Sequence, residues 1–165
     1  MMENYAKKTV QALLERNLRI ATAESCTGGL TAKLITDISG ASAVFECGVV
    51  SYANRIKESL LGVRGETLRQ YGAVSEQAVR EMAEGVQKLS GANVTVAISG
   101  IAGPDSDGTD KPVGLFWIAV FYQNTVFTKK LNNRFSVNIR ENNRNAAANE
   151  ALKLVYEVIL HEKAV

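Results

Sequence analysis

The chain has 165 residues, 46% of them hydrophobic, and its 19 basic side chains nearly balance 17 acidic ones, which leaves a formal net charge of +2. This composition supports one folded domain with an apolar core and excludes a disordered chain. The charge balance gives no reason to expect nucleic acid or an anionic membrane as a partner, and no apolar run approaches the roughly 20 residues that span a bilayer.

Helices and strands alternate in the first two thirds of the chain, and the period of the apolar residues distinguishes the two. The predicted elements of this part are, in order, a helix ending near Asn17, a strand over 19–23, a small-residue turn over 25–29, a helix over 30–38, a strand over 44–52, a short helix from a cap at Asn54 to Gly62, a second short helix over 66–70, a helix after a cap at Ser75, and an apolar strand over 93–99. The helix after Ser75 is expected to bury one apolar face that includes Val79, Met82, Val86 and Leu89.

The last third predicts a hairpin and a long helix. Strands are expected over 113–122 and 125–131, joined by Gln123 and Asn124, and the helix over 139–161. Residues 1–165 are therefore expected to form a single three-layer α/β/α domain with a mixed, mostly parallel sheet and an antiparallel edge.

Three polar segments directly follow predicted strands, at 24–29, 52–57 and 99–105. In sheets of this kind, ligands bind outside the carboxyl ends of the parallel strands. We therefore expect the three segments to converge on one crevice.

The turn that begins at Ser25 has two interpretations. It follows a buried strand and precedes Gly28, Gly29 and a helix, so its backbone N–H groups suit a phosphate or an oxyanion. The plainer interpretation, which the residues alone favour, is an ordinary strand-to-helix turn with a capping hydroxyl. The glycine patterns of the P-loop and of the dinucleotide fingerprint do not occur here.

A nucleophilic serine needs a base. The one histidine, His161, falls at the end of the last predicted helix and is expected to be solvated. A lysine can replace histidine where burial lowers its pKa to roughly 7–8. Lys57 is the candidate because it follows a strand end, although most lysines on such helices are simply solvated. Tyr52 either relays a proton or orients Lys57, or packs its ring and exposes its hydroxyl.

Cys26 is a rival nucleophile, since a helix N-terminus favours a thiolate, yet buried cysteines are commonly inert. Cys47 falls in an apolar strand and is expected in the core. Two cysteines and one histidine are too few for a usual zinc site. Because the segment up to Val10 has no signal-peptide character, we expect a cytosolic protein with free thiols. Glu24 is expected to cap or orient rather than to act as an acid.

Two further features can bind an anion. Gly100 and Gly103 bracket a loop whose backbone N–H groups suit a phosphate or an amide oxygen, or they form only a tight turn. Arg140 and Arg144 share one helix face and either clamp a phosphate or carboxylate or lie in solvent.

Six segments, taken in their order along the chain, carry a resemblance to a known family that none of these features carries alone. They are Thr22-Ala-Glu-Ser-Cys-Thr-Gly-Gly29, Gly48-Val-Val-Ser-Tyr-Ala-Asn54 with Lys57, Leu61-Gly-Val63, Gly72-Ala-Val-Ser-Glu76, Ser99-Gly-Ile-Ala-Gly-Pro-Asp105 and Lys111-Pro-Val-Gly114. In this order they resemble the CinA C-terminal-domain family, from about Val10 onward. The chain is similar to the stand-alone form, without the second domain of longer members.

The resemblance implies an activity. Stand-alone members are nicotinamide-nucleotide amidases, which convert nicotinamide mononucleotide (NMN) to nicotinate mononucleotide and ammonia without a metal or cofactor, and the family suggests a homodimer or higher homo-oligomer. By position, Ser25 is implied as the nucleophile, Lys57 as its base and Tyr52 as their partner. The implied substrate contacts are Glu24, Cys26, Thr27, Gly28, Gly29, Ser99, Gly100, Ile101, Ala102, Gly103, Arg140 and Arg144.

The chain also departs from the family pattern. Ser99 stands where the family usually has threonine, and Phe135-Ser-Val-Asn-Ile-Arg140 stands where it often has Phe-x-Gly-Asp-Arg. The second departure leaves open a non-catalytic nucleotide-binding paralogue. Cys26 leaves open a third hypothesis, a cysteine-dependent amide hydrolase.

Overall fold

The computed structural model describes residues 4–161. The elements follow the predicted alternation. In chain order they are α1 (Tyr5–Arg16), β1 (Ile20–Glu24), α2 (Leu30–Thr36), the short 3₁₀ helix η1 (Ala41–Ala43), β2 (Phe45–Val50), α3 (Asn54–Leu61), α4 (Gly65–Tyr71), α5 (Glu76–Ser90), β3 (Val94–Gly100), β4 (Leu115–Tyr122), β5 (Thr125–Asn132) and α6 (Ile139–Leu160).

The strands form one five-stranded sheet in the order β2-β1-β3-β4-β5. β1 pairs in parallel with both β2 and β3, whereas β4 pairs antiparallel with β3 and β5. Four strands therefore run one way and β4 runs against them, as expected of a mixed sheet with an antiparallel edge. Gln123 and Asn124 both have positive φ, 48° and 58°, which suits a tight hairpin turn between twisted strands.

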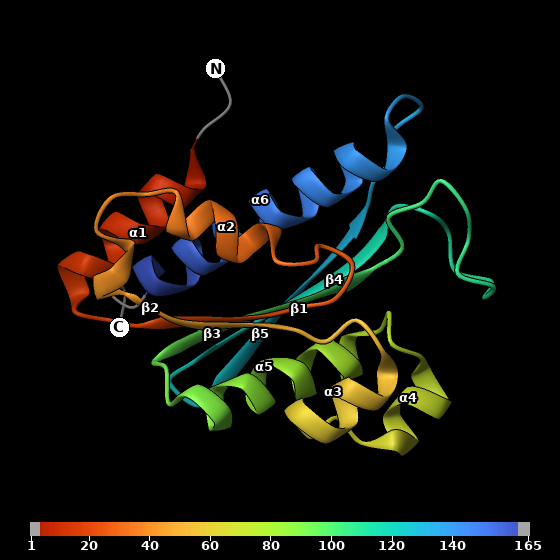
Figure 1. The fold of residues 1–165 in the computed structure, drawn as a ribbon, viewed down its shortest axis with the longest axis horizontal. Helices are drawn as coiled ribbons and strands as arrows, with labels where there is room; N and C mark the ends of the chain where they lie inside the picture. Colours follow the sequence, from red (N-terminus) through yellow and green to blue (C-terminus); the bar gives the residue numbers. More distant parts are fainter. Residues whose placement is uncertain (1–3, 162–165) are drawn as a thin grey trace.

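Helices cover both faces of the sheet, so the predicted three layers are confirmed. α1, α2 and α6 lie on one face and α3, α4 and α5 on the other (Figure 1). One apolar core lies on the α1 and α6 side and includes Leu13, Ile118 and Leu152; a second lies under α5 and includes Met82 and Ala97.

Two local predictions need correction. Leu89 was expected on the buried face of α5, but it is 51% exposed, because α3 ends at Leu61 and leaves a groove beside the last turn of α5. Asn54 was expected to cap α3, but it is the first residue of that helix and Ala53 holds the cap position without a side-chain hydrogen bond. The cap at Ser75 is confirmed, since its hydroxyl accepts from Ala78 N–H at 3.1 Å.

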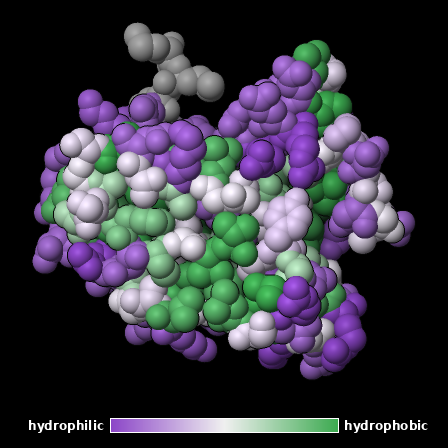
Figure 2. All heavy atoms as spheres, viewed as in Figure 1, coloured by the Kyte–Doolittle hydropathy of each residue, from purple (hydrophilic) through white to green (hydrophobic). Residues whose placement is uncertain are grey.

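The surface mixes polar and apolar side chains. Figure 2 shows apolar side chains gathered across the middle of the face seen in Figure 1. Exposed large apolar residues of the molecule include Val50, Leu60 and Leu89. Over residues 4–161, none of the helices combines the length and the apolar character that crossing a membrane requires.

Candidate active site

The segments that follow β1, β2 and β3 meet at one edge of the sheet, as predicted. Because these three strands run in the same direction, their carboxyl ends share that edge. Two sets of hydrogen bonds report the convergence. Lys57 Nζ reaches Ser25 Oγ from the segment after β2, and the Arg140 guanidinium spans the hydroxyl of Tyr52 and the carbonyl of Gly103.

Lys57 is the most buried basic side chain of this edge, with 1% of its surface exposed. It is the fourth residue of α3, and its amine points back toward the end of β2. Nζ lies 3.0 Å from Ser25 Oγ, 2.8 Å from the carbonyl oxygen of Ser51 and 3.4 Å from that of Tyr52. The two carbonyls can only accept a hydrogen bond, whereas the serine hydroxyl can accept or donate one.

Burial lowers the pKa of Lys57 below its usual 10.5, and the nearby Cys26 opposes the shift only weakly. The first turn of α3 acts in the same direction, because the positive end of a helix dipole disfavours a cation. A neutral amine has two N–H groups and one lone pair. When the two carbonyls of Ser51 and Tyr52 take the N–H groups, the lone pair is left facing Ser25 Oγ.

Ser25 stands where β1 leaves the sheet. Its N–H donates to the carbonyl of Ile98 at 3.1 Å, and its own carbonyl accepts from Gly28 N–H at 3.0 Å. Gly28 and Gly29 have φ of 60° and 97°, a left-handed region that other residues rarely adopt. The two glycines therefore let the chain reverse tightly after Ser25 and enter α2 at Leu30.

The start of α2 is already occupied by a protein carboxylate, which favours the plainer of the two interpretations, a capped strand-to-helix turn. The carboxylate of Glu24, itself 1% exposed, accepts from Thr31 N–H at 3.0 Å and from Ala32 N–H at 2.9 Å. These are first-turn donors that an external anion would need. Glu24 is therefore bound inside the protein as a cap, and not turned toward a substrate.

The turn before α2 still offers main-chain donors. Over the described part of the chain, no backbone carbonyl accepts from the N–H groups of Cys26 or Thr27. Both groups directly follow Ser25, and both lie within hydrogen-bond reach of the Cys26 sulfur, where they lower the pKa of its thiol against the larger effect of burial. The hydroxyl of Thr27 is buried and has no partner among the described residues, which adds a polar atom to this wall.

Of the two interpretations of Cys26, a thiolate at a helix N-terminus or an inert buried thiol, the structure favours the second. Cys26 lies in the turn and not on the first turn of α2, and burial raises the pKa of its thiol to about 12, with a smaller contribution from Glu24. A thiol with this pKa is protonated at neutral pH and is a poor nucleophile. Cys47, expected in the core, is only partly buried at the edge strand β2.

The loop after β3 is tied to its neighbours through its main chain. Ser99, Ile101 and Ala102 are all buried, and Ile101 N–H donates to the carbonyl of Leu115 at 2.9 Å. Gly100 is required by packing, since a Cβ there would lie 2.1 Å from the ring of Phe116. Gly103 has φ of 80° and precedes Pro104 through a cis peptide bond.

The two predicted arginines hold the loops of the site to α6. Arg144 Nε donates to the carbonyl of Cys26 at 3.1 Å and its Nη2 to that of Thr27 at 2.8 Å. Arg140 Nη1 donates to the carbonyl of Gly103 at 2.9 Å and its Nη2 to the hydroxyl of Tyr52 at 3.1 Å. Arg144 is half-buried and Arg140 is exposed, and protein oxygens already take several of the N–H groups of both.

Tyr52 meets Lys57 differently from the prediction. Its backbone carbonyl, and not its hydroxyl, accepts from the lysine amine, while the hydroxyl accepts from Arg140. The side chain is 59% exposed. The hydroxyl thus does not bridge Lys57 and Ser25.

Two residues of the site were missed by the sequence reasoning. Asn143 is buried on α6 and its Nδ2 donates to the carbonyl of Ala102 at 2.9 Å, and Ser51 supplies the shortest contact of Lys57. Asn143 was detectable in principle, because it lies on the helix face between Arg140 and Arg144. The contact of Ser51 is made by a carbonyl, which no side-chain pattern reveals.

His161 lies far from this edge, as expected. It lines a hollow with Tyr122, and Tyr122 pairs with Val94 at the opposite end of β3. Within residues 4–161, no group of three or more His, Cys, Asp or Glu side chains is arranged to hold a metal ion. A cavity of about 340 Å³ borders the site where Pro104 and Arg140 meet.

The fold and this site define an α/β domain with a buried lysine paired to a serine at the carboxyl ends of its parallel strands. The family model described as the CinA C-terminal domain matches residues 2–159, and the chain belongs to this family.

Three comparisons show how close the relatives are. The chain is 57% identical over 109 residues to the nicotinamide-nucleotide amidohydrolase PncC of Escherichia coli (strain K12), covering 66% of each. It is 52% identical over 122 residues to a CinA-like protein of Thermotoga neapolitana, covering 74% of this chain and 30% of that protein. A crystal structure of a CinA superfamily protein from Klebsiella pneumoniae superposes with a TM-score of 0.92 at 32% identity, over 97% of this chain and 99% of that one. The chain spans about a third of the length of the longer curated relatives it matches.

Proposed function

We propose that this protein hydrolyses the carboxamide of NMN to give nicotinate mononucleotide and ammonia. The observation that carries the proposal is the contact of 3.0 Å between Nζ of the buried Lys57 and Oγ of the half-buried Ser25. The name of the Escherichia coli relative, a nicotinamide-nucleotide amidohydrolase, supports this choice of substrate.

In the proposed first step, neutral Lys57 accepts the proton of the Ser25 hydroxyl while Ser25 Oγ attacks the carboxamide carbon. The Oγ–C bond forms, the carbonyl π bond opens, and the negative charge moves to the carboxamide oxygen. The main-chain N–H groups of Cys26 and Thr27 stabilise that oxygen. The positive charge of the pyridinium ring withdraws electrons from the carboxamide and makes its carbon more reactive.

In the second step, the proton held by Lys57 passes to the leaving nitrogen, the C–N bond breaks and ammonia departs. The acyl group then remains on Ser25 Oγ as an ester. A water molecule gives its proton to Lys57 and attacks the ester carbon, and the proton returns to Ser25 Oγ as nicotinate mononucleotide leaves. The amine of Lys57 thus acts as base and then as acid in each of the two half-reactions.

The remaining contacts follow from the walls of the crevice. Main-chain N–H groups of the turn after Ser25 and of the loop from Gly100 to Gly103 are proposed to meet the polar groups of the nucleotide. Arg140 and Arg144 hold these walls in place and offer their remaining N–H groups to the phosphate. Tyr52 is proposed to face the ligand through its exposed hydroxyl.

A non-catalytic nucleotide-binding protein is the second candidate. It is motivated by the segment 135–140, which departs from the family pattern; there Asn138 takes a left-handed conformation, with φ of 45°, directly before α6. Asparagine tolerates this conformation better than most residues, so the segment turns without a glycine. Tight binding of NMN without turnover would favour this candidate.

The deciding experiment incubates the purified protein with NMN and measures ammonia and nicotinate mononucleotide together. We expect both products in equal amounts, and we expect Ser25→Ala and Lys57→Ala each to abolish them. Binding measured by calorimetry in the same samples separates an inactive binder from a protein that does not recognise NMN. Unchanged turnover in either variant would refute the proposed mechanism.

Two further properties belong to the proposal. We propose that the protein acts in the cytosol, since Cys26 and Cys47 are both free thiols. A homodimer stays a prediction of the family resemblance, and sedimentation equilibrium decides it.

A further inference from the structure

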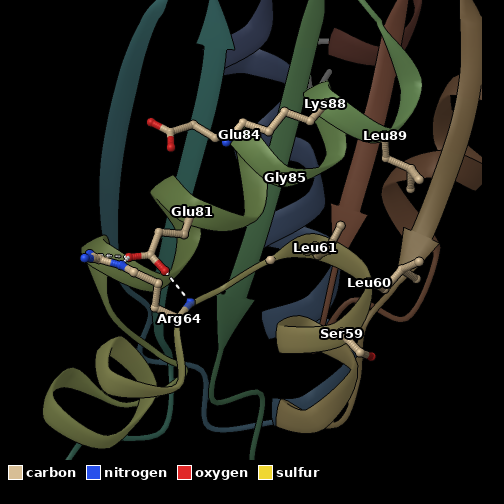
Figure 3. Close-up of a pocket in the computed structure, with 10 residues that line it drawn as sticks. Ser59, Leu60, Leu61, Arg64, Glu81, Glu84, Gly85, Lys88 and Leu89 are labelled. Atoms are coloured by element: carbon tan, nitrogen blue, oxygen red, sulfur yellow. Dashed lines mark hydrogen bonds and ion pairs between the residues drawn. The ribbon is translucent and has the colours of Figure 1, made fainter.

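Gly85 stands in the middle of α5, where glycine is less favourable than almost any other residue. Its neighbours in space are not side chains but the end of α3. A Cβ atom placed on Gly85 would lie 1.8 Å from the carbonyl oxygen of Leu61, 2.7 Å from its carbonyl carbon and 3.0 Å from its Cα. Figure 3 shows Leu61 at the end of α3 next to Gly85 on α5. The two helices therefore touch through their backbones.

The contact between Gly85 and Leu61 lies at the C-terminal end of α3, the same short helix that carries Lys57. Leu61 is one turn after Lys57 on α3, and its carbonyl is among the last of the helix, which have no partner inside it. The chain then turns at Gly62, and Val63 N–H donates to the carbonyl of Lys57 at 3.1 Å. Val63 is itself buried in the core under α5. The backbone of Lys57 is thus tied to the part of α3 that rests on α5.

The amine of Lys57 has little freedom to compensate for a shift of α3. It is bound at 2.8 Å to the carbonyl of Ser51 and at 3.0 Å to Ser25 Oγ, and its side chain is 1% exposed. A methyl group on Gly85 needs the Leu61 oxygen to retreat from 1.8 Å to at least 3.0 Å, which is a movement of 1.2 Å or more. A misplacement of about 1 Å in a reacting group can lower a rate by about 100-fold.

We propose that Gly85 is a positioning residue for the reaction. Because Gly85 has no side chain, α3 packs directly against α5, and this backbone contact sets the distance from Lys57 Nζ to Ser25 Oγ. The inference rests on the proposed function, because it takes Lys57 and Ser25 as the reacting pair. Gly85 itself touches neither the pair nor the crevice. It acts through α3.

The test compares Gly85→Ala with Gly91→Ala. Gly91 ends the same helix with φ of 68°, and a Cβ placed on it would have no atom within 4 Å, so its substitution strains α5 without touching α3. We expect Gly85→Ala to lower kcat for NMN by about 10- to 100-fold with KM within about twofold of the wild type. Gly91→Ala is expected to keep the wild-type kcat.

A second readout needs no substrate. In protein labelled with ¹³C at the lysine ε-carbon, the Lys57 resonance is followed against pH. We expect the titration of Lys57 to move to higher pH in Gly85→Ala, because water reaches an amine that has been displaced from its buried position. We expect the acidic limb of the kcat–pH profile to move to higher pH with it. Among the neighbouring ionisable groups, Cys26 in the turn after β1 acts on the charge of the amine, Glu24 at the end of β1 acts on Cys26, and Tyr52 contacts the amine through its backbone carbonyl.

The outcomes separate the two proposals. If wild-type protein does not hydrolyse NMN, the proposed function fails, while the Lys57 titration still tests the role of Gly85. A folded Gly85→Ala protein with wild-type kcat and wild-type Lys57 titration overturns the inference, and so does an equal loss in Gly91→Ala. Should Gly85→Ala not fold, Val63→Ala loosens the same end of α3 without a clash. In Val63→Ala, a lower kcat at constant KM together with a Lys57 titration at higher pH then supports the inference. Unchanged kcat and an unchanged Lys57 titration overturn it.

Discussion

Replacing Lys57 with methionine separates the chemistry of its amine from the packing of its side chain. The side chain is 1% exposed, and its Nζ contacts Ser25 Oγ at 3.0 Å and the carbonyl of Ser51 at 2.8 Å. Methionine is unbranched, apolar and of similar length, so it occupies the same space. Lys57→Met therefore removes the proposed base and little else.

The effect on activity follows from the role of a general base. Such a base typically contributes about 10²- to 10⁴-fold to a rate. Since each factor of ten corresponds to about 1.4 kcal/mol, the transition state loses about 3–5.5 kcal/mol. KM is expected to stay nearly constant, because the amine of Lys57 donates to protein atoms and not to the substrate.

The effect on stability is expected to be much smaller. The carbonyls of Ser51 and Tyr52 lose a donor, at about 1–3 kcal/mol for each buried group left unpaired. Removal of a buried amine offsets this cost, because taking a charge out of water is itself unfavourable by several kcal/mol. We expect the free energy of unfolding to change by less than about 2 kcal/mol.

The pH dependence of the free energy of unfolding shows the direction in which removal of the Lys57 amine changes stability. The folded-state pKa of Lys57 lies below its usual 10.5, so between these two values the unfolded chain binds the extra proton. Wild-type stability therefore falls as the pH is lowered through this window. Lys57→Met lacks this loss, so its stability relative to the wild type should improve from pH 10.5 downward.

Ammonia release from NMN and urea unfolding, measured on the same preparations, test these expectations. Ser25→Ala combined with Lys57→Met should be no slower than either single variant, because the two residues act as a unit. Lys88→Met, which changes a lysine on α5 away from the reacting pair, is the matched control and should keep full activity. Turnover of Lys57→Met within tenfold of the wild type, or losses that add in the double variant, would refute the reasoning.

Four other predictions concern the same edge of the sheet. Turnover should rise with pH through the lowered pKa of Lys57, because only its neutral amine accepts a proton; a flat profile from neutral to alkaline pH contradicts this. Cys26→Ala should keep turnover within about threefold, because a thiol with a pKa of about 12 is not a nucleophile at neutral pH, and a larger loss in a folded variant would revive the cysteine hypothesis. Glu24→Ala should lower the free energy of unfolding by about 2–4 kcal/mol in urea titrations, because two N–H groups of α2 lose their acceptor; a change below about 1 kcal/mol argues against the cap. Tyr52→Phe should slow turnover about 10-fold through loss of its hydrogen bond to Arg140, measured as kcat/KM, and an unchanged value would leave that bond without a role.

Much of the fold was predictable because it depends on local rules. The hairpin at Gln123 and Asn124 and the cap at Ser75 follow from the residues themselves. The convergence of the segments after β1, β2 and β3 follows from their parallel pairing. For these features, spacing along the chain is enough.

The details of the site were not predictable in the same way, because they depend on packing between distant elements. Lysine on a short helix is usually solvated, and the burial of Lys57 depends on contacts with Ser25 and Ser51, which lie outside its helix. Glu24 was predicted to cap or orient, but that its carboxylate fills the start of α2 depends on the path of the intervening turn. Arg140 and Arg144 were placed correctly on one face, yet their partners are largely backbone carbonyls that no residue pattern marks.

The attachment of the crevice to α6 has a consequence for how the protein is made. Ser25 and Lys57 are 32 residues apart in the chain, whereas Arg144 contacts a carbonyl 118 residues before it. A growing chain therefore contains Ser25 and Lys57 long before the helix that holds the turn after Ser25 has been synthesised. Contacts of such long range form late, because the loop they close must be ordered first. The turn that follows Ser25 is thus tied to α6 only after α6 has been synthesised, and a chain interrupted before α6 lacks that contact.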